Sequence, residues 1–175
     1  MKDSRGIRWA RGFGFVAGLS IAIAAVVAWR IPAGTGTLGT DLTIAVVPTG
    51  ELDVSAPGPF VTGTGLRPGT ESDAPSGTVK VRNETGSTLS FRVKVVPSIA
   101  DLDRLLWIEI EAGGEQLFRG PLGDLRDGSD RTFRLASGQK TTIGVRAWLP
   151  ASVTSGYEGR IESVDLTFVP LLGGA

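Results

Sequence analysis

The sequence predicts an all-β protein, a two-sheet, jelly-roll-like sandwich preceded by an N-terminal signal or transmembrane helix. Short segments of alternating apolar and polar residues recur along the chain, with turn residues between them. The 25 glycines and 10 prolines are scattered without a period, which is typical of many turns. A total of 175 residues, 41% of them hydrophobic, is one domain's length and enough for a sizeable core.

The N-terminus has the parts of an export signal. Four basic residues precede a long apolar run: Lys2, Arg5, Arg8 and Arg11. Val26 and Ala28 satisfy the small-residue rule for signal peptidase cleavage between Ala28 and Trp29. The uncharged run is also long enough to span a bilayer, so an uncleaved membrane anchor through residues 13–29 is the alternative. In both cases we expect the rest of the chain to be exported.

A glycine-rich stretch, "GTGTLG" from Gly34 to Gly39, spells the G-x-G-x-x-G pattern of dinucleotide-binding loops. Such a loop must follow a buried strand and begin a helix. Here it follows the export segment and Pro32, and a strand pattern comes after it, so a flexible linker is the better interpretation.

These patterns divide the chain into four parts. We expect a signal peptide or membrane anchor at 1–28, a flexible glycine-rich segment at 29–40, the β-sandwich domain at 41–170 and a tail at 171–175.

Three strands are predicted in the first half of the exported part. "TDLTIAVVP" alternates, with Leu42, Ile44 and Val46 on one face. "GTVKVRN" directs Val79 and Val81 inward. In "STLSFRVKVVP" four residues share a face: Leu89, Phe91, Val93 and Val95.

The second half predicts a hairpin and three more strands. "LLWIEIEAGGEQLFRG" alternates around the pair Gly113-Gly114, which can take the positive φ of a two-residue turn. "RTFRL", "KTTIGVRAWLP" and "RIESVDLTFVP" follow, the last with apolar positions Ile161, Val164, Leu166 and Phe168. The total is eight or nine strands. Between the strands, "SIADLDRLL" is predicted to be helical.

Charge and composition exclude several function classes. Basic and acidic residues number 18 each, without a block of either sign, which argues against a nucleic-acid partner. Histidine and cysteine are absent, so thiol nucleophiles and the usual zinc ligand sets are excluded, and no cofactor is implied. No serine lies in a G-x-S-x-G elbow. We therefore expect a protein that is not an enzyme.

Two groups of carboxylates are candidates for a site. Asp124, Asp127 and Asp130 are oxygen ligands of the kind calcium prefers, but their spacing is not that of an EF-hand loop, and a surface turn uses the same residues. Glu109 and Glu111 share a strand face with Trp107, where a solvated outer face is the simpler interpretation. Neither group is assigned as a metal or catalytic site.

The spacing of turn and strand residues resembles a known family. "LRPGTESDAPSGTVKVRNETGS" carries Leu66, Pro68, Gly69, Gly77, Val79, Val81, Asn83, Gly86 and Ser87, similar to the L-x-P-G and G-x-V-x-V-x-N-x-G-S signature of the TasA and camelysin family of exported biofilm matrix proteins. "LFRGPLGDL" is similar to that family's L-Y-x-G-x-L-x-D-L, through Leu117, Phe118, Gly120, Leu122, Asp124 and Leu125. Further matches are Gly138, Leu149, Pro150, Tyr157, Gly159 and Phe168.

The resemblance implies an exported, non-enzymatic subunit of the cell surface or biofilm matrix, trimmed by a signal peptidase. Its partners would be copies of itself or other matrix proteins. In the family, the freed N-terminal segment of one subunit adds a strand to the next, and the large apolar residues available for this here are Trp29, Ile31 and Leu38. Metalloprotease activity, described for some members, does not carry over, because no histidine is available for an H-E-x-x-H site.

Overall fold

The computed structural model describes residues 39–55, 57–96 and 101–171. The chain divides into two compact units, Met1–Ala33 and Gly34–Ala175, and the described residues all belong to the second. Among them, no helix is long and apolar enough to cross a membrane.

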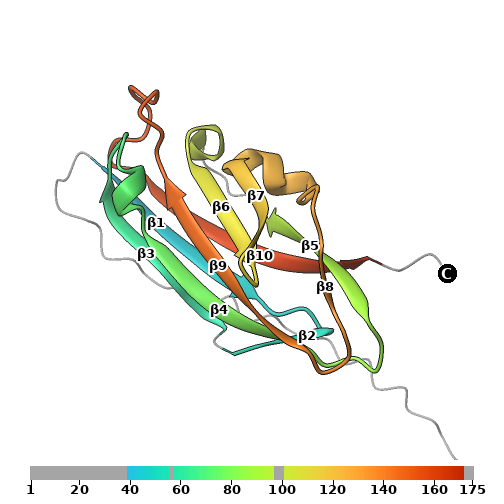
Figure 1. Ribbon diagram of the computed structural model, residues 1–175. Coiled ribbons are helices and arrows are strands. Elements are labelled where there is room, and N and C mark those ends of the chain that lie inside the picture. The colour runs from blue at the N-terminus through green and yellow to red at the C-terminus, as the bar shows by residue number, and fades with distance from the viewer. Residues whose placement is uncertain (1–38, 56, 97–100, 172–175) are drawn as a thin grey trace, which may run out of the picture. The chain divides into compact units, whose positions relative to one another are not determined.

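Ten strands and three short 3-10 helices make up the described part of the chain (Figure 1). The strands are β1 (Thr40–Val47), β2 (Leu52–Val54), β3 (Gly58–Leu66), β4 (Ser76–Asn83), β5 (Leu89–Val96), β6 (Trp107–Ala112), β7 (Glu115–Pro121), β8 (Phe133–Leu135), β9 (Lys140–Trp148) and β10 (Ile161–Leu171). The 3-10 helices are η1 (Glu71–Asp73), η2 (Asp101–Arg104) and η3 (Leu122–Asp127).

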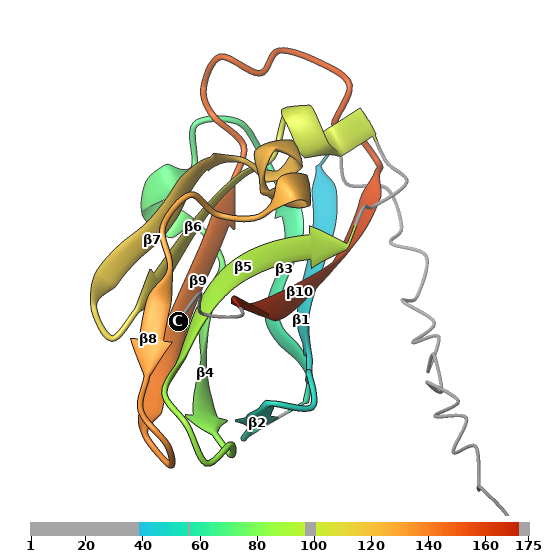
Figure 2. The same cartoon turned by 90° about the vertical axis from the view of Figure 1, so that its right-hand side faces the viewer.

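The strands form two five-stranded sheets that pack face to face (Figure 2). The order in the first, called sheet A, is β3-β1-β10-β5-β8, and in the second, called sheet B, β2-β4-β9-β6-β7. Neighbouring strands are antiparallel, except that β1 and β10 run parallel in the middle of sheet A. The predicted all-β, two-sheet class is confirmed.

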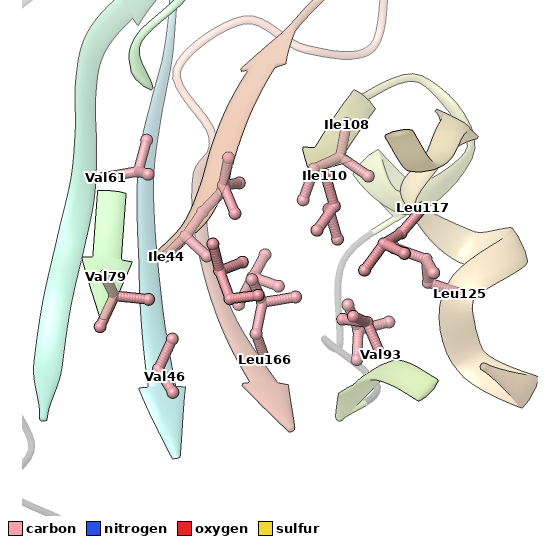
Figure 3. Packing of buried hydrophobic residues seen from close by; sticks show 14 of the residues in the cluster. Ile44, Val46, Val61, Val79, Val93, Ile108, Ile110, Leu117, Leu125 and Leu166 are labelled. Atoms are coloured by element: carbon pink, nitrogen blue, oxygen red, sulfur yellow. The ribbon is translucent and has the colours of Figure 1, made fainter. Parts of the chain in front are cut away.

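The core lies between the two sheets and has the residues that strand alternation predicts. Leu42, Ile44 and Val46 of β1 are buried, as are Val79 and Val81 of β4. Figure 3 shows such side chains from both sheets, together with Leu125 of η3, packed into one cluster. The hairpin is also as predicted, because Gly113 and Gly114 have φ of 60° and 87° and join β6 to β7.

The structure differs from the predicted elements in three places. Strands β2 and β3 were not predicted, since glycines and prolines interrupt the apolar alternation there. In β10, Ile161 is 46% exposed and Glu162 takes the inward position, so the apolar residue at the start of that strand lies on the outer face. Of the predicted helix in 98–106, residues 101–106 are described, and they contain only the short η2, Asp101–Arg104.

Two strands, β2 and β3, lie along different parts of the outer edge of β4, on one side of the sandwich. Val81 to Asn83 pair with β2, while at the other end of β4 the backbone of β3 lies against Gly77. A Cβ atom at Gly77 would lie 2.1 Å from the carbonyl oxygen of Phe60. Only glycine permits this approach.

Candidate functional site

The outer face of sheet B carries a cluster of tryptophan, arginine and glutamate side chains. Alternation along β6 and β9 sends Ile108, Ile110, Val145 and Ala147 into the core, and therefore sends the intervening residues to the opposite face. Pairing of β6 with β7 and β9 then brings these outward residues together. With one residue from η1, the aromatic–arginine cluster consists of Glu71, Trp107, Glu109, Arg119, Arg146 and Trp148.

Trp148 is the centre of this cluster. The guanidinium carbons of Arg119 and Arg146 lie 5.5 and 5.4 Å from its ring centroid, within the range of a cation–π interaction. Trp107, its cross-strand partner, lies 6.2 Å away between ring centroids, tilted by 51°. Trp148 is consequently only 2% exposed although it is on the outer face, whereas Trp107 is half-buried.

Two carboxylates hold the arginines in place. Glu71 Oε1 accepts a hydrogen bond from Arg119 Nη2 at 2.5 Å and lies 3.6 Å from Arg146 Nη2. Glu109, with a side chain only 9% exposed, pairs with Arg146 Nε. The loop that contains η1 is thus tied to strands β7 and β9 by charge-assisted contacts.

A depression of about 240 Å³ opens beside the cluster. It is lined by Gly69, Glu71, Trp107, Arg119, Trp148, Pro150 and Ala151. Two segments form its rim, the chain after β3 and the chain after β9. They are joined to each other, because Gly69 N–H donates a hydrogen bond to the carbonyl of Leu149 at 2.9 Å and Pro68 forms a β-bridge with Leu149. The depression therefore combines an aromatic wall, a carboxylate and a guanidinium, and its rim is fixed by backbone contacts. These are the features of a small binding site.

None of the site residues predicted from the sequence belongs to the aromatic–arginine cluster. The cleavage pair Ala28 and Trp29 and the donor-strand residues Ile31 and Leu38 fall outside the described residues. Asp124, Asp127 and Asp130 are exposed, and within the described part of the chain no three such ligands converge on a common point for a metal ion.

Sequence reasoning recognised only part of the aromatic–arginine cluster. Glu109 and Trp107 were correctly placed on one outer face, but Glu109 is buried against Arg146 rather than solvated. Arg146 and Trp148 could have been found from their alternation with Val145 and Ala147. Glu71 could not, since its loop is far in the sequence from Arg119 and Arg146, the residues that it contacts.

Two of the residues that carry the family resemblance, Asn83 and Gly138, have structural roles. The side-chain amide of Asn83 donates to the carbonyls of Ser87 and Leu135 at 2.8 and 3.0 Å, and its oxygen accepts from the N–H and hydroxyl of Thr85. Gly138, at φ 70°, donates to the Asn83 carbonyl. Asn83 therefore joins the β4–β5 turn to the chain around β8.

The last glycine of the "GTGTLG" stretch is also structural. A Cβ atom at Gly39 would lie 2.4 Å from the backbone of Gly65, and the Gly39 carbonyl accepts a hydrogen bond from Gly159 N–H at 3.0 Å. Gly39 is buried directly before β1, where it lies against the backbone of Gly65.

No family model matches the chain, and no curated protein matches it. Among solved structures, the chain is similar to the N-terminal domain of PorA, at 9% sequence identity over 80% of this chain and 92% of that one, with a TM-score of 0.27. A similarity at that level does not establish a shared fold.

Proposed function

We propose that the protein is an exported, non-enzymatic structural subunit of the cell surface or biofilm matrix, which associates with copies of itself by strand addition. The proposal includes a jelly-roll-like sandwich and removal of the N-terminal helix by a signal peptidase between Ala28 and Trp29. The basic and apolar N-terminus and the resemblance to the TasA and camelysin family support export and assembly.

The edge of β7 is the observation that carries strand addition. Within the described chain β7 has a sheet neighbour on one side only, β6, and it is seven residues long. The other edges are less open, because β2 and β8 have three residues each and the backbone of β3 lies against β4. A long strand with an unpaired edge is a template for another chain.

The backbone of Gln116 indicates which groups a donor strand would meet. Its carbonyl accepts a hydrogen bond from Arg131 Nη1 at 3.1 Å, on the side away from β6. The N–H and carbonyl of one residue in a strand point to the same side, so the Gln116 N–H also faces outward. The proposed donor is the segment from Trp29 to Leu38 of a neighbouring copy, with Trp29, Ile31 and Leu38 as apolar anchors.

The association can be tested with proline at the open edge. In the chain that begins at Trp29, Gln116→Pro removes an outward N–H without removing a bond to β6, and Gln116→Ala is the matched control. We expect sedimentation velocity and electron microscopy to show assemblies for the parent chain and Gln116→Ala, and monomers for Gln116→Pro. Unchanged assembly of Gln116→Pro, or a strictly monomeric parent chain at high concentration, contradicts the proposal.

The depression beside the aromatic–arginine cluster favours a second function, that of a membrane-anchored extracytoplasmic binding module. In this alternative, residues 13–29 remain as the anchor. Fractionation followed by immunoblotting separates the two: a full-length band in the membrane fraction supports the anchored module, and a shortened secreted band supports the matrix subunit.

A further inference from the structure

The depression on the outer face of sheet B has an unusual combination of an aromatic wall and a balanced set of charges. The four charged side chains of the aromatic–arginine cluster are two arginines and two glutamates, and each glutamate contacts an arginine. The cluster as a whole is therefore neutral. A ligand with a formal charge would gain little electrostatic binding energy from the cluster, because each charged side chain in it is already balanced by a neighbour of opposite charge.

The polar groups at the rim still have hydrogen-bonding capacity. The side chains of Arg119 and Glu71 are 41% and 42% exposed. A guanidinium has five N–H donors, and the contact with Glu71 engages Arg119 through Nη2. A carboxylate accepts up to about four hydrogen bonds. A ligand in the depression thus meets donors and acceptors side by side, held in position by the salt bridge and by the stacking of Arg119 on Trp148.

The remaining walls are apolar and the space is small. Trp107 offers a half-buried indole, with Pro150 and Ala151 nearby. The volume of about 240 Å³ is below the range of roughly 300 to 1,000 Å³ that is usual for drug-sized ligands. It suits a single ring with one apolar face and a polar edge.

We infer that this depression is a binding site for one neutral sugar unit of a glycan. The C–H face of a pyranose ring stacks on Trp107, and its hydroxyl groups, which both donate and accept, meet Glu71 and Arg119. A proline residue of an extended peptide would also fit an aromatic wall, but it uses neither the carboxylate nor the guanidinium. The inference does not depend on strand addition, because the depression lies on the face of sheet B and the proposed assembly uses the edge of β7.

The test is a titration of the intact isotope-labelled chain, followed by NMR. The probes are neutral oligosaccharides of glucose, galactose, mannose and N-acetylglucosamine, together with an oligoproline peptide, each at millimolar concentration. We expect at least one oligosaccharide to shift the Trp107 indole resonance and the backbone resonances of Gly69 and Ala151. Shifts with oligoproline and with no sugar overturn the inference, as does the absence of shifts with every sugar.

Three variants assign the binding to the depression. Trp107→Ala should weaken sugar binding by about tenfold or more, as expected for an aromatic anchor, while Trp107→Phe should retain most of it. Thr142→Ala changes an exposed residue of β9 outside the depression and should bind as the parent does. If Trp107→Ala is not folded by circular dichroism, Arg119→Met takes its place with the same expected loss. Equal binding by the parent and by a folded depression variant overturns the inference.

Discussion

At the scale of single residues, several side chains are required by a contact rather than by strand propensity. Asn83 is fully buried on β4, and all of its polar atoms are used between two turns. Gly77 lies where the backbone of β3 crosses close to β4. In the sequence these two residues are parts of the signature that resembles the TasA and camelysin family, but the reason for each lies in chain segments that only folding brings near.

The close contact at Gly77 predicts a large difference between two neighbouring glycines. Gly77→Ala would place a Cβ atom 2.1 Å from the Phe60 carbonyl oxygen, so the free energy of unfolding should fall by about 1 to 3 kcal/mol. Gly144 pairs next to it in the β4–β9 ladder, and no atom would lie within 4 Å of a Cβ there. Gly144→Ala should leave stability unchanged or raise it by about 0.4 to 1 kcal/mol. Urea unfolding measures both, and equal effects would show that β3 does not approach β4 closely.

At the scale of elements, local pattern and cross-strand pairing contribute differently. The turn and the two strands of the β6–β7 hairpin were predictable, because its turn residues and its alternation are contiguous in the sequence, whereas the register shift between Ile110 and Glu111 was not predicted. Strands β2 and β3 were not, because their regularity comes from pairing with β4 and β1. The contact between Arg146 and Glu109 is likewise a product of pairing.

The salt bridge on the outer face of sheet B should contribute to stability through the burial of Glu109. Arg146→Ala leaves that carboxylate, which is 9% exposed, without its arginine, and it removes one of the two guanidinium groups that cover Trp148. We expect a loss of about 1 to 3 kcal/mol in the free energy of unfolding. Arg134→Ala, at an exposed position of β8, serves as the control and should change stability by no more than about 0.5 kcal/mol.

A second substitution tests the cause of that loss. Changing Glu109→Gln in the Arg146→Ala background removes the buried charge, so part of the lost stability should return. Denaturant unfolding of the four members of this cycle measures the coupling. Additive effects of the two substitutions would mean that the contact contributes nothing as a pair.

At the scale of the whole molecule, sheet A depends on the pairing of the first described strand, β1, with the last, β10. The parallel pair of β1 and β10 lies in the interior of the sheet, with β3 outside one and β5 outside the other. Residues separated by more than 100 positions are thus neighbours, as in Asp41 and Ile161. The hydrophobic pattern of each strand marks its buried face, but it does not specify which strand lies beside it.

This arrangement predicts the order in which the sheets open. β9 and β10 are the central strands of sheets B and A, whereas β2 and β8 are three-residue edge strands. In native-state hydrogen exchange followed by NMR, the amides of β9 and β10 should exchange only through global unfolding, and those of β2 and β8 through local opening at much lower free energy. Protection of β2 or β8 equal to that of β10 would contradict the strand order.

Local information in the sequence determined the all-β class, most of the strand faces and the hairpin turn, since each depends on residues close together in the chain. It also determined what chemistry is excluded, because a chain without histidine or cysteine lacks those ligands in any fold. The sheet order and the aromatic–arginine cluster were decided by tertiary structure alone. Both arise from pairing between distant strands, and the side chain of Glu71 meets Arg119 and Arg146 only after β3, β7 and β9 have been brought together.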